Sequence, residues 1–212
     1  MDNREIKITN PTSKVALKII PGHFATSHSH INYYIDMSTM KTRQSEASEI
    51  AKAMAGQYSN NTVVDTIVCL DGCEVIGAYL AQELTNAGIL SVNLHKTMYI
   101  ITPEYNTSGQ MIFKENTLKA VRGKHILLLV ASVTTGKTVR KSMECIQYYN
   151  GIMTGISAIF SAVKQIDNTP INSVFTADDL PGYEAYKTHD CPFCKANQKL
   201  DAIVNSYGYI KL

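Results

Sequence analysis

The stretch that decides the fold reads His125-Ile-Leu-Leu-Leu-Val-Ala-Ser-Val-Thr-Thr-Gly-Lys-Thr138. Its apolar run, Ile126 to Val130, is typical of a strand that is buried on both faces of a parallel sheet. A small, hydroxyl-rich loop follows, and residues 137–149 have the pattern of a helix. The first N–H groups of a helix have no partner within it, and the helix dipole places partial positive charge there. The segment therefore predicts a phosphate site.

The candidate phosphate ligands lie in this loop and in the first helical turn. They are Ser132, Thr134, Thr135, Gly136, Lys137 and Thr138. The hydroxyl groups are donors, and the glycine lets the backbone approach a ligand closely. A lysine in the first turn is unfavourable to the helix dipole unless an anion is bound there, so Lys137 itself favours an anion site.

Two known phosphate-binding patterns fit the loop. Ala131 to Thr138 matches a Walker A motif in which alanine replaces the first glycine. The same residues resemble the ribose-phosphate loop of type I phosphoribosyltransferases, where an apolar strand, two acids and two small or apolar residues precede Thr-Thr-Gly-x-Thr. About 125 residues precede the loop and about 75 follow it, whereas a Walker loop usually follows the first strand. The late position favours the phosphoribosyltransferase resemblance, nearest to the orotate group.

A second turn adds to the resemblance. Asp65 to Leu70 is another apolar strand, and Asp71-Gly72-Cys73 leads from it into an amphipathic helix. In the family, a turn at this place binds the pyrophosphate of phosphoribosyl pyrophosphate, together with Mg²⁺. Taken alone, Asp-Gly is also common in an ordinary turn between a strand and a helix.

The polar segment between these two strands corresponds to the mobile loop of the family, which closes over the active site and excludes water. Its residues here are Tyr105, Asn106, Ser108, Gly109 and Lys114. Orotate phosphoribosyltransferases carry an Arg-Lys pair near the preceding strand end and further lysines in the loop. Here Thr102-Pro103 replaces that pair, and Lys114 is the only cation of the loop.

The larger departure concerns two acids. Val130 and Ala131 stand where the family has carboxylates that hold the ribose hydroxyls and, indirectly, magnesium. Ser132 is the nearest polar replacement, but it supplies no charge. No catalytic residue is assigned for this reason. Two alternatives to phosphoribosyl transfer stay open: a non-catalytic, regulatory protein that binds a nucleotide or phosphoribosyl ligand on the same fold, and a P-loop-type nucleoside triphosphate-binding protein.

The order of elements predicts an α/β fold, with a parallel twisted sheet covered by helices on both faces. Strands and helices are expected to alternate over 64–70, 74–88, 97–102, 125–131, 137–149 and 152–162, with further strands at 14–20 and 172–176, a helix at 45–58 and an irregular C-terminus. The resemblance implies a single domain, 1–212, with its core at 60–165. It also implies a small hood from 1–40 and 178–212 that selects the nucleobase.

Aromatic residues of the two terminal segments are candidates for stacking on that base. They are Phe24, Tyr33, Tyr34 and Phe193. The alternative is that these rings belong to the apolar core, which is the commoner fate of an aromatic side chain.

Histidines and cysteines near the two ends raise the question of a metal. His23, His28 and His30 include a His-x-His pair, whose imidazoles share one face of a strand. Cys191-Pro-Phe-Cys194 provides half of a structural zinc site, and His189 is the nearby third ligand. Zinc needs four ligands and only three are close in sequence, so zinc is not the favoured interpretation but stays an alternative, as does a redox pair. A structural use of the two cysteines is preferred over a catalytic one.

Composition limits the remaining classes. The net charge of the 212-residue chain is +2, which implies no strong attraction to nucleic acid or to a membrane surface, and the chain has no apolar run of about 20 residues. Five cysteines with one CxxC fit a reducing, cytoplasmic compartment. The resemblance implies phosphoribosyl pyrophosphate or a nucleotide as the small-molecule partner, orotate or another base as acceptor, and a homodimer.

Overall fold

The computed structural model describes residues 4–11, 13–58, 61–86, 91–94 and 97–212. Residues 87 and 88, expected at the end of a helix, lie outside this part. Within the described ranges, no helix is long and apolar enough to cross a membrane.

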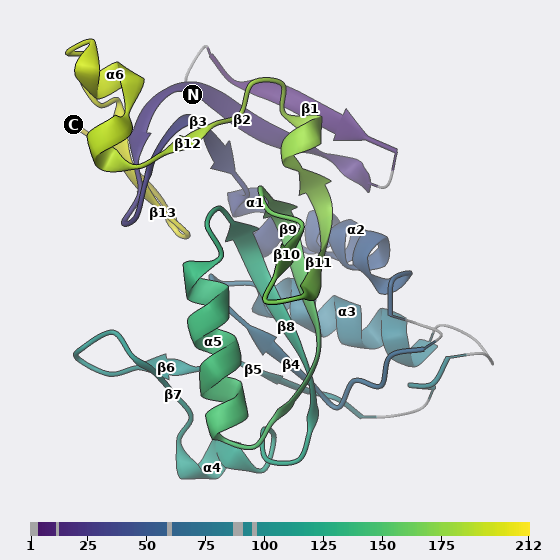
Figure 1. Cartoon of the computed structure of the whole chain (residues 1–212). Coiled ribbons are helices and arrows are strands. Elements are labelled where there is room, and N and C mark those ends of the chain that lie inside the picture. Colours follow the sequence, from purple (N-terminus) through teal and green to yellow (C-terminus); the bar gives the residue numbers. More distant parts are fainter. Residues whose placement is uncertain (1–3, 12, 59–60, 87–90, 95–96) are drawn as a thin grey trace.

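Six strands form the central sheet, in the order β10-β11-β9-β8-β4-β5 (Figure 1). All neighbours from β11 to β5 pair in parallel, and the short edge strand β10 is antiparallel to β11. This confirms the expected α/β class with a parallel sheet. The bounds are β4 Thr66–Cys69, β5 Tyr99–Ile101, β8 His125–Val133, β9 Ile152–Ser161, β10 Gln165–Ile166 and β11 Thr169–Thr176.

Helices cover both faces of this sheet (Figure 1). The odd-numbered residues of β8 from Leu127 to Ala131 pack with α2 and α3, and the even-numbered ones from Ile126 to Val130 pack with α5. Each residue of the run Ile126 to Val130 is at most 2% exposed, and burying one such side chain stabilises the fold by about 1.5–3 kcal/mol. The helices are α1 Ser38–Thr42, α2 Gln44–Ala55, α3 Glu74–Asn86, α4 Glu115–Leu118 and α5 Lys137–Tyr148.

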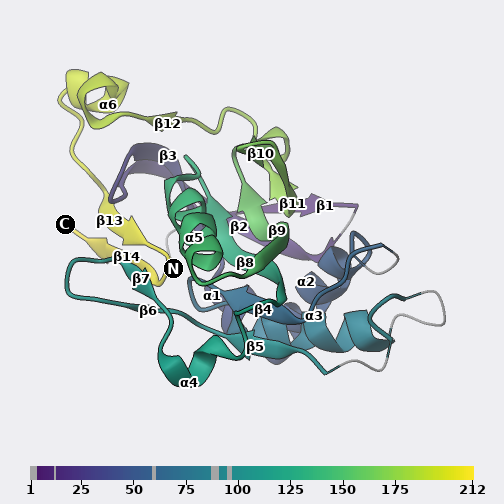
Figure 2. The same ribbon diagram turned by 60° about the horizontal axis from the view of Figure 1, so that its bottom comes forward.

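The two chain ends form a second sheet, which we call the terminal sheet (Figure 2). Its order is β12-β3-β2-β13-β14, and β1 also pairs with β2. The expected irregular C-terminus was wrong: its short strands find their partners near the N-terminus, so they have no strong local strand signal. The bounds are β1 Ile6–Asn10, β2 Ser13–Ala25, β3 His30–Asp36, β12 Ala185–Tyr186, α6 Pro192–Lys195, β13 Ala202–Asn205 and β14 Gly208–Lys211.

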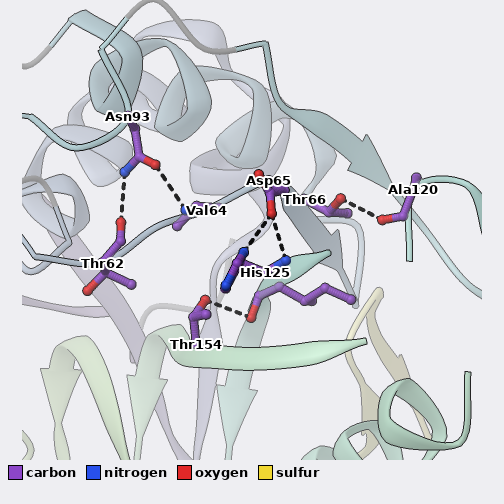
Figure 3. A network of polar contacts seen from close by, with 9 residues as sticks. Thr62, Val64, Asp65, Thr66, Asn93, Ala120, His125 and Thr154 are labelled. Atoms are coloured by element: carbon purple, nitrogen blue, oxygen red, sulfur yellow. Dashed lines mark hydrogen bonds and ion pairs between the residues drawn. The ribbon is translucent and has the colours of Figure 1, made fainter. Parts of the chain in front are cut away.

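A polar network ties β4 to β8 at their amino-terminal ends (Figure 3). The carboxylate of Asp65 accepts hydrogen bonds from the backbone N–H of His125 (2.9 Å) and from its Nδ1 (2.8 Å). The Asn93 side chain accepts from the N–H of Val64 and donates to the carbonyl of Thr62. Burial by itself would raise the pKa of Asp65, but the hydrogen bonds from His125 outweigh it and lower that pKa. The network fixes strand register at the edge opposite to the candidate site.

Candidate phosphate site

A cavity of about 250 Å³ lies at the carboxyl-terminal ends of β4 and β8, the edge where parallel sheets bind ligands. All six candidate phosphate ligands line it, namely Ser132, Thr134, Thr135, Gly136, Lys137 and Thr138. Of the three residues expected to bind pyrophosphate, Asp71 lines the cavity, whereas Gly72 and Cys73 do not. The remaining walls come from residues between Thr26 and Lys41, from Phe160 and Tyr183, and from residues 204–206 at the end of β13 and in the turn after it. We call this space the phosphate cavity.

The loop between β8 and α5 has the geometry of an anion site. Gly136 is the N-cap of α5, and no side chain caps this helix end. The first turn also contains no acidic residue. The earliest bond of the helix runs from the N–H of Arg140 to the carbonyl of Gly136 (2.9 Å). The N–H groups and partial positive charge of the helix start therefore stand at the wall of the phosphate cavity.

Gly136 is required here for two reasons. Its φ of +75° lies in the left-handed region, which side chains other than glycine rarely adopt. In addition, a Cβ at this position would lie 2.6 Å from Cδ1 and 3.0 Å from Cγ1 of Ile166. The glycine lets the loop turn tightly against β10 before α5 begins.

The turn after β4 places a carboxylate at the same cavity. Asp71 has a φ of +58°, and Gly72 has a φ of +76°. Burial raises the pKa of Asp71, against the opposing effects of hydrogen bonds from the Ser206 side chain and the Ala131 backbone and of the charge of Lys41. Among the described residues that line the phosphate cavity, Asp71 is the only acid.

Lys41, on α1, is a cavity residue that sequence reasoning missed. It is only 6% exposed, and its ammonium group donates to the carbonyl of Asp71 (2.9 Å) and to the carbonyl of Ser206. It also lies 5.7 Å from the ring centre of Tyr207. A buried lysine keeps its charge most easily beside acceptors or anions. A lone lysine in a short helix carries no sequence signal for this position.

The expected mobile loop is a short hairpin of β6 (Glu104–Tyr105) and β7 (Met111–Ile112). Tyr105, Ser108 and Gly109 line a second cavity of about 740 Å³ between the hairpin and α5, and this cavity shares residues with the phosphate cavity. The Asn106 side chain accepts the backbone N–H groups of the hairpin tip, at Ser108 and Gln110. The mobility of the β6–β7 hairpin stays a prediction.

Lys114, the expected cation of the loop, forms an ion pair with Glu104 across the base of the hairpin (Nζ to Oε2, 2.7 Å). It lines neither of the two described cavities. Cations at the cavities come instead from α1 and α5, through Lys41, Lys137 and Lys141.

Positions 130 and 131, where the resemblance predicts two acids, have different surroundings. Val130 is 2% exposed and lines the phosphate cavity. Ala131 is fully buried in the core between β8 and the α2–α3 layer. A carboxylate at 131 would therefore face apolar side chains, which is costly for a charged group.

One of the four candidate stacking rings lies at the phosphate cavity. It is Tyr34, whose pKa burial raises to about 12. Phe24 packs against it in the core of the terminal sheet (ring centres 6.0 Å apart), Tyr33 packs at the edge of the α2–α3 core, and Phe193 lies against His23 (5.2 Å). Tyr183, which the sequence did not single out, also lines the cavity; burial raises its pKa, against an opposing effect of Thr134.

His189 does not join the two cysteines of the CxxC motif, Cys191 at the N-cap of α6 and Cys194 within this helix. Its Nε2 contacts Asp190 (3.0 Å), and the ring is exposed. The residues that do gather are His23, His30, Cys191 and Cys194, whose ligand atoms all lie within 4.8 Å of one another. Sequence reasoning had noted both halves of this group but did not join them.

Solved structures with a similar fold include three structures of two phosphoribosyltransferases. They are the orotate enzyme of Mycobacterium tuberculosis in complex with Fe(III) dicitrate (14% identity, 78% of this chain and 93% of that chain, TM-score 0.52), the adenine enzyme of Thermoanaerobacter pseudethanolicus (14%, 68% and 88%, 0.51), and the M. tuberculosis orotate enzyme in complex with 5-phospho-α-D-ribosyl 1-diphosphate (13%, 69% and 82%, 0.50). No family model and no curated protein matches the sequence. Together with the parallel sheet and the loop between β8 and α5, these likenesses show that the chain has the fold of type I phosphoribosyltransferases.

Proposed function

We propose that the chain binds phosphoribosyl pyrophosphate in the phosphate cavity and transfers its phosphoribosyl group to a nucleobase, with release of pyrophosphate. In this reaction a base nitrogen gives up its proton to solvent and forms a bond to C1 of the ribose, while the C1–O bond breaks and pyrophosphate leaves with the electron pair. The observation that carries the proposal is the meeting of the uncapped α5 N-terminus, the Asp71 turn and buried Lys41 at one cavity.

Each wall of the cavity suits one part of this ligand. The hydroxyls of Thr134, Thr135 and Thr138 and the start of α5 suit the terminal 5′-phosphate, because they offer donors and positive partial charge. Lys41 and Asp71 line the same cavity, and we assign them to the pyrophosphate. Catalysis on such a site would consist mainly of positioning and charge stabilisation.

Magnesium is part of the proposal by resemblance. Asp71 is the residue that fits it, because Mg²⁺ is commonly held by one or two carboxylates together with substrate phosphates and water. When bound, the ion would neutralise charge on the leaving pyrophosphate. The burial that raises the pKa of Asp71 also means that a nearby cation would favour its ionised form.

Calorimetric titration tests the ligand. Phosphoribosyl pyrophosphate with magnesium is compared with ATP, orotidine monophosphate and ribose 5-phosphate. We expect binding of phosphoribosyl pyrophosphate in preference to ATP, and weaker binding in Lys137→Ala. Lys119→Ala removes the same charge from an exposed position just after α4 and should bind as the unchanged protein does. Binding of ATP alone would contradict the proposal and favour a P-loop-type function.

A second candidate function is binding without transfer, and the apolar residues Val130 and Ala131 favour it. The two functions differ in pyrophosphate release. Each nucleobase of a panel that includes orotate is added at a saturating concentration. If the chain transfers the phosphoribosyl group, pyrophosphate should be released only when the base that it uses is present. Tight binding with no release from any base would instead identify a binding or regulatory protein.

A further inference from the structure

Two histidines of the N-terminal hairpin and two cysteines near the C-terminus form a compact group of metal-binding side chains. His23 lies in β2 and His30 begins β3, whereas Cys191 and Cys194 flank the first turn of α6. Cys191 and Cys194 both contact His23, although they follow it in the chain by 168 and 171 residues. His23, His30 and Cys191 are buried, and Cys194 is exposed. The group stands apart from the phosphate cavity, which none of the four residues lines.

The distances within the group match a tetrahedral zinc site. With Zn–S of about 2.3 Å and Zn–N of about 2.0–2.1 Å, tetrahedral donors lie about 3.3 Å (N to N) and about 3.5 Å (N to S) apart. Nε2 of His23 is 3.0 Å from Nδ1 of His30. Sγ of Cys194 is 3.3 Å from Nδ1 of His30, and Nε2 of His23 is 3.4 Å from Sγ of Cys191 and 3.7 Å from Sγ of Cys194. All four separations fall within a few tenths of an ångström of the tetrahedral values.

The surroundings orient the ring of His23 as they do for a metal ligand. Its Nδ1 lies 3.0 Å from the carbonyl oxygen of Gln198, so the proton belongs on Nδ1 and the lone pair of Nε2 faces the group. The carboxylate of Asp201 accepts the backbone N–H of His23 (2.8 Å), which fixes the strand position. Phe193, between the two cysteines in sequence, packs its ring on His23.

The donor chemistry selects the metal. Two thiolates and two imidazoles at the corners of a tetrahedron are a common ligand set of structural Zn²⁺ sites. Both cysteines are free of a disulfide. A CxxC disulfide would remove both thiolates from the group.

We propose that His23, His30, Cys191 and Cys194 bind one zinc ion, which joins the β2–β3 hairpin to the C-terminal segment. The hairpin turn between the two histidines, residues 26–29, lines the phosphate cavity. Beyond α6, the C-terminal segment supplies Asn205 and Ser206 to the same cavity. The ion therefore holds in place two of the segments that close the cavity, while it takes no part in chemistry there.

The first experiment measures metal content. The chain, purified without chelator, is expected to hold one zinc per chain by elemental analysis. His30→Asn and Cys191→Ser should lose it. His189→Asn is the matched control, because this histidine lies beside the CxxC in sequence but outside the group, and it should retain the full content. Retention by His30→Asn together with loss in His189→Asn would overturn the ligand set.

A second measurement uses the unchanged chain, so it does not depend on the folding of a variant. Zinc is removed by a chelator and replaced with Co²⁺. Tetrahedral cobalt with two thiolates is expected to show intense visible d–d bands and sulfur-to-cobalt charge-transfer bands. Octahedral spectra, or a Cys191–Cys194 disulfide found by thiol counting under denaturing conditions in the protein as purified, would overturn the proposal. Removal of zinc should also lower the melting temperature and weaken binding of inorganic phosphate in the cavity.

Discussion

Replacement of Gly136 by alanine tests the geometry of the phosphate loop most directly. At φ +75° the new Cβ costs about 1–2 kcal/mol of backbone energy, as for any left-handed residue with a side chain. Contact with Ile166 at 2.6 and 3.0 Å adds the cost of overpacking, about 1–3 kcal/mol. Rotation of the Ile166 side chain can move Cδ1 away, but Cγ1 remains close. We therefore expect a loss of about 2–5 kcal/mol in the free energy of unfolding.

Gly123 is the matched control for the backbone term. Its φ is +68°, and a Cβ there would meet no atom within 4 Å. Gly123→Ala should therefore lose only about 1–2 kcal/mol. Both variants are compared by urea unfolding with linear extrapolation, at unchanged m-value. The difference between them measures the contact with Ile166.

A double-mutant cycle isolates that contact. Ile166→Val removes Cδ1 and by itself should cost about 0.5–1.5 kcal/mol, since the side chain is buried. In the Gly136→Ala background the same change relieves the clash, so the two should couple by about 1 kcal/mol. Phosphate binding should fall in Gly136→Ala and stay unchanged in Gly123→Ala. Equal losses in the two alanine variants, without coupling to Ile166, would refute the reasoning.

Two further predictions concern stability at the two edges of the sheet. Because hydrogen bonds lower the folded-state pKa of Asp65 below its ordinary value of about 3.9, its contribution is present above that pH and is lost as the pH falls through the lowered pKa. Asp65→Asn should be less stable than the unchanged chain in urea at neutral pH, with the difference shrinking in acid; a constant difference would contradict this. Ala131→Asp buries a charge in the α2–α3 core and should lose about 3–5 kcal/mol in thermal unfolding or fail to fold, whereas Ala131→Ser should be mild.

The central part of the fold could be predicted from sequence because its signals are local. One stretch of the sequence contains the apolar run of β8, the glycine of the loop and the helical pattern of α5. Each of these signals depends on residues that are close together in the chain. The strand expected over 97–102 was longer than β5, Tyr99–Ile101. Strand ends depend on pairing partners, which a local pattern does not contain.

Contacts between distant segments explain what the sequence did not reveal. Lys41 is buried because the Asp71 turn and Ser206, from the other end of the chain, supply its acceptors. The sequence did not join the four proposed zinc ligands for the same reason. Proximity in the sequence favoured His189 as the partner of the cysteines. In the structure, the pairing of β12 with β3 and of β13 with β2 brings His23 and His30 to them instead. Side-chain chemistry was visible in the sequence, but the partners were not.

The missing acids at Val130 and Ala131 have a structural counterpart one strand away. The backbone N–H of Ala131 acts on the carboxyl of Asp71, at the end of β4, by lowering its pKa against the effect of burial. This carboxyl therefore stands directly beside the strand end where the family carries its two acids, although it comes from the turn expected to bind pyrophosphate. A single carboxylate at this point would have to serve both the ribose and the leaving group. If transfer occurs, Asp71→Asn should lower the rate of pyrophosphate release by a larger factor than it weakens binding of phosphoribosyl pyrophosphate. If the chain only binds, the unchanged protein releases no pyrophosphate, and Asp71→Asn should change binding alone.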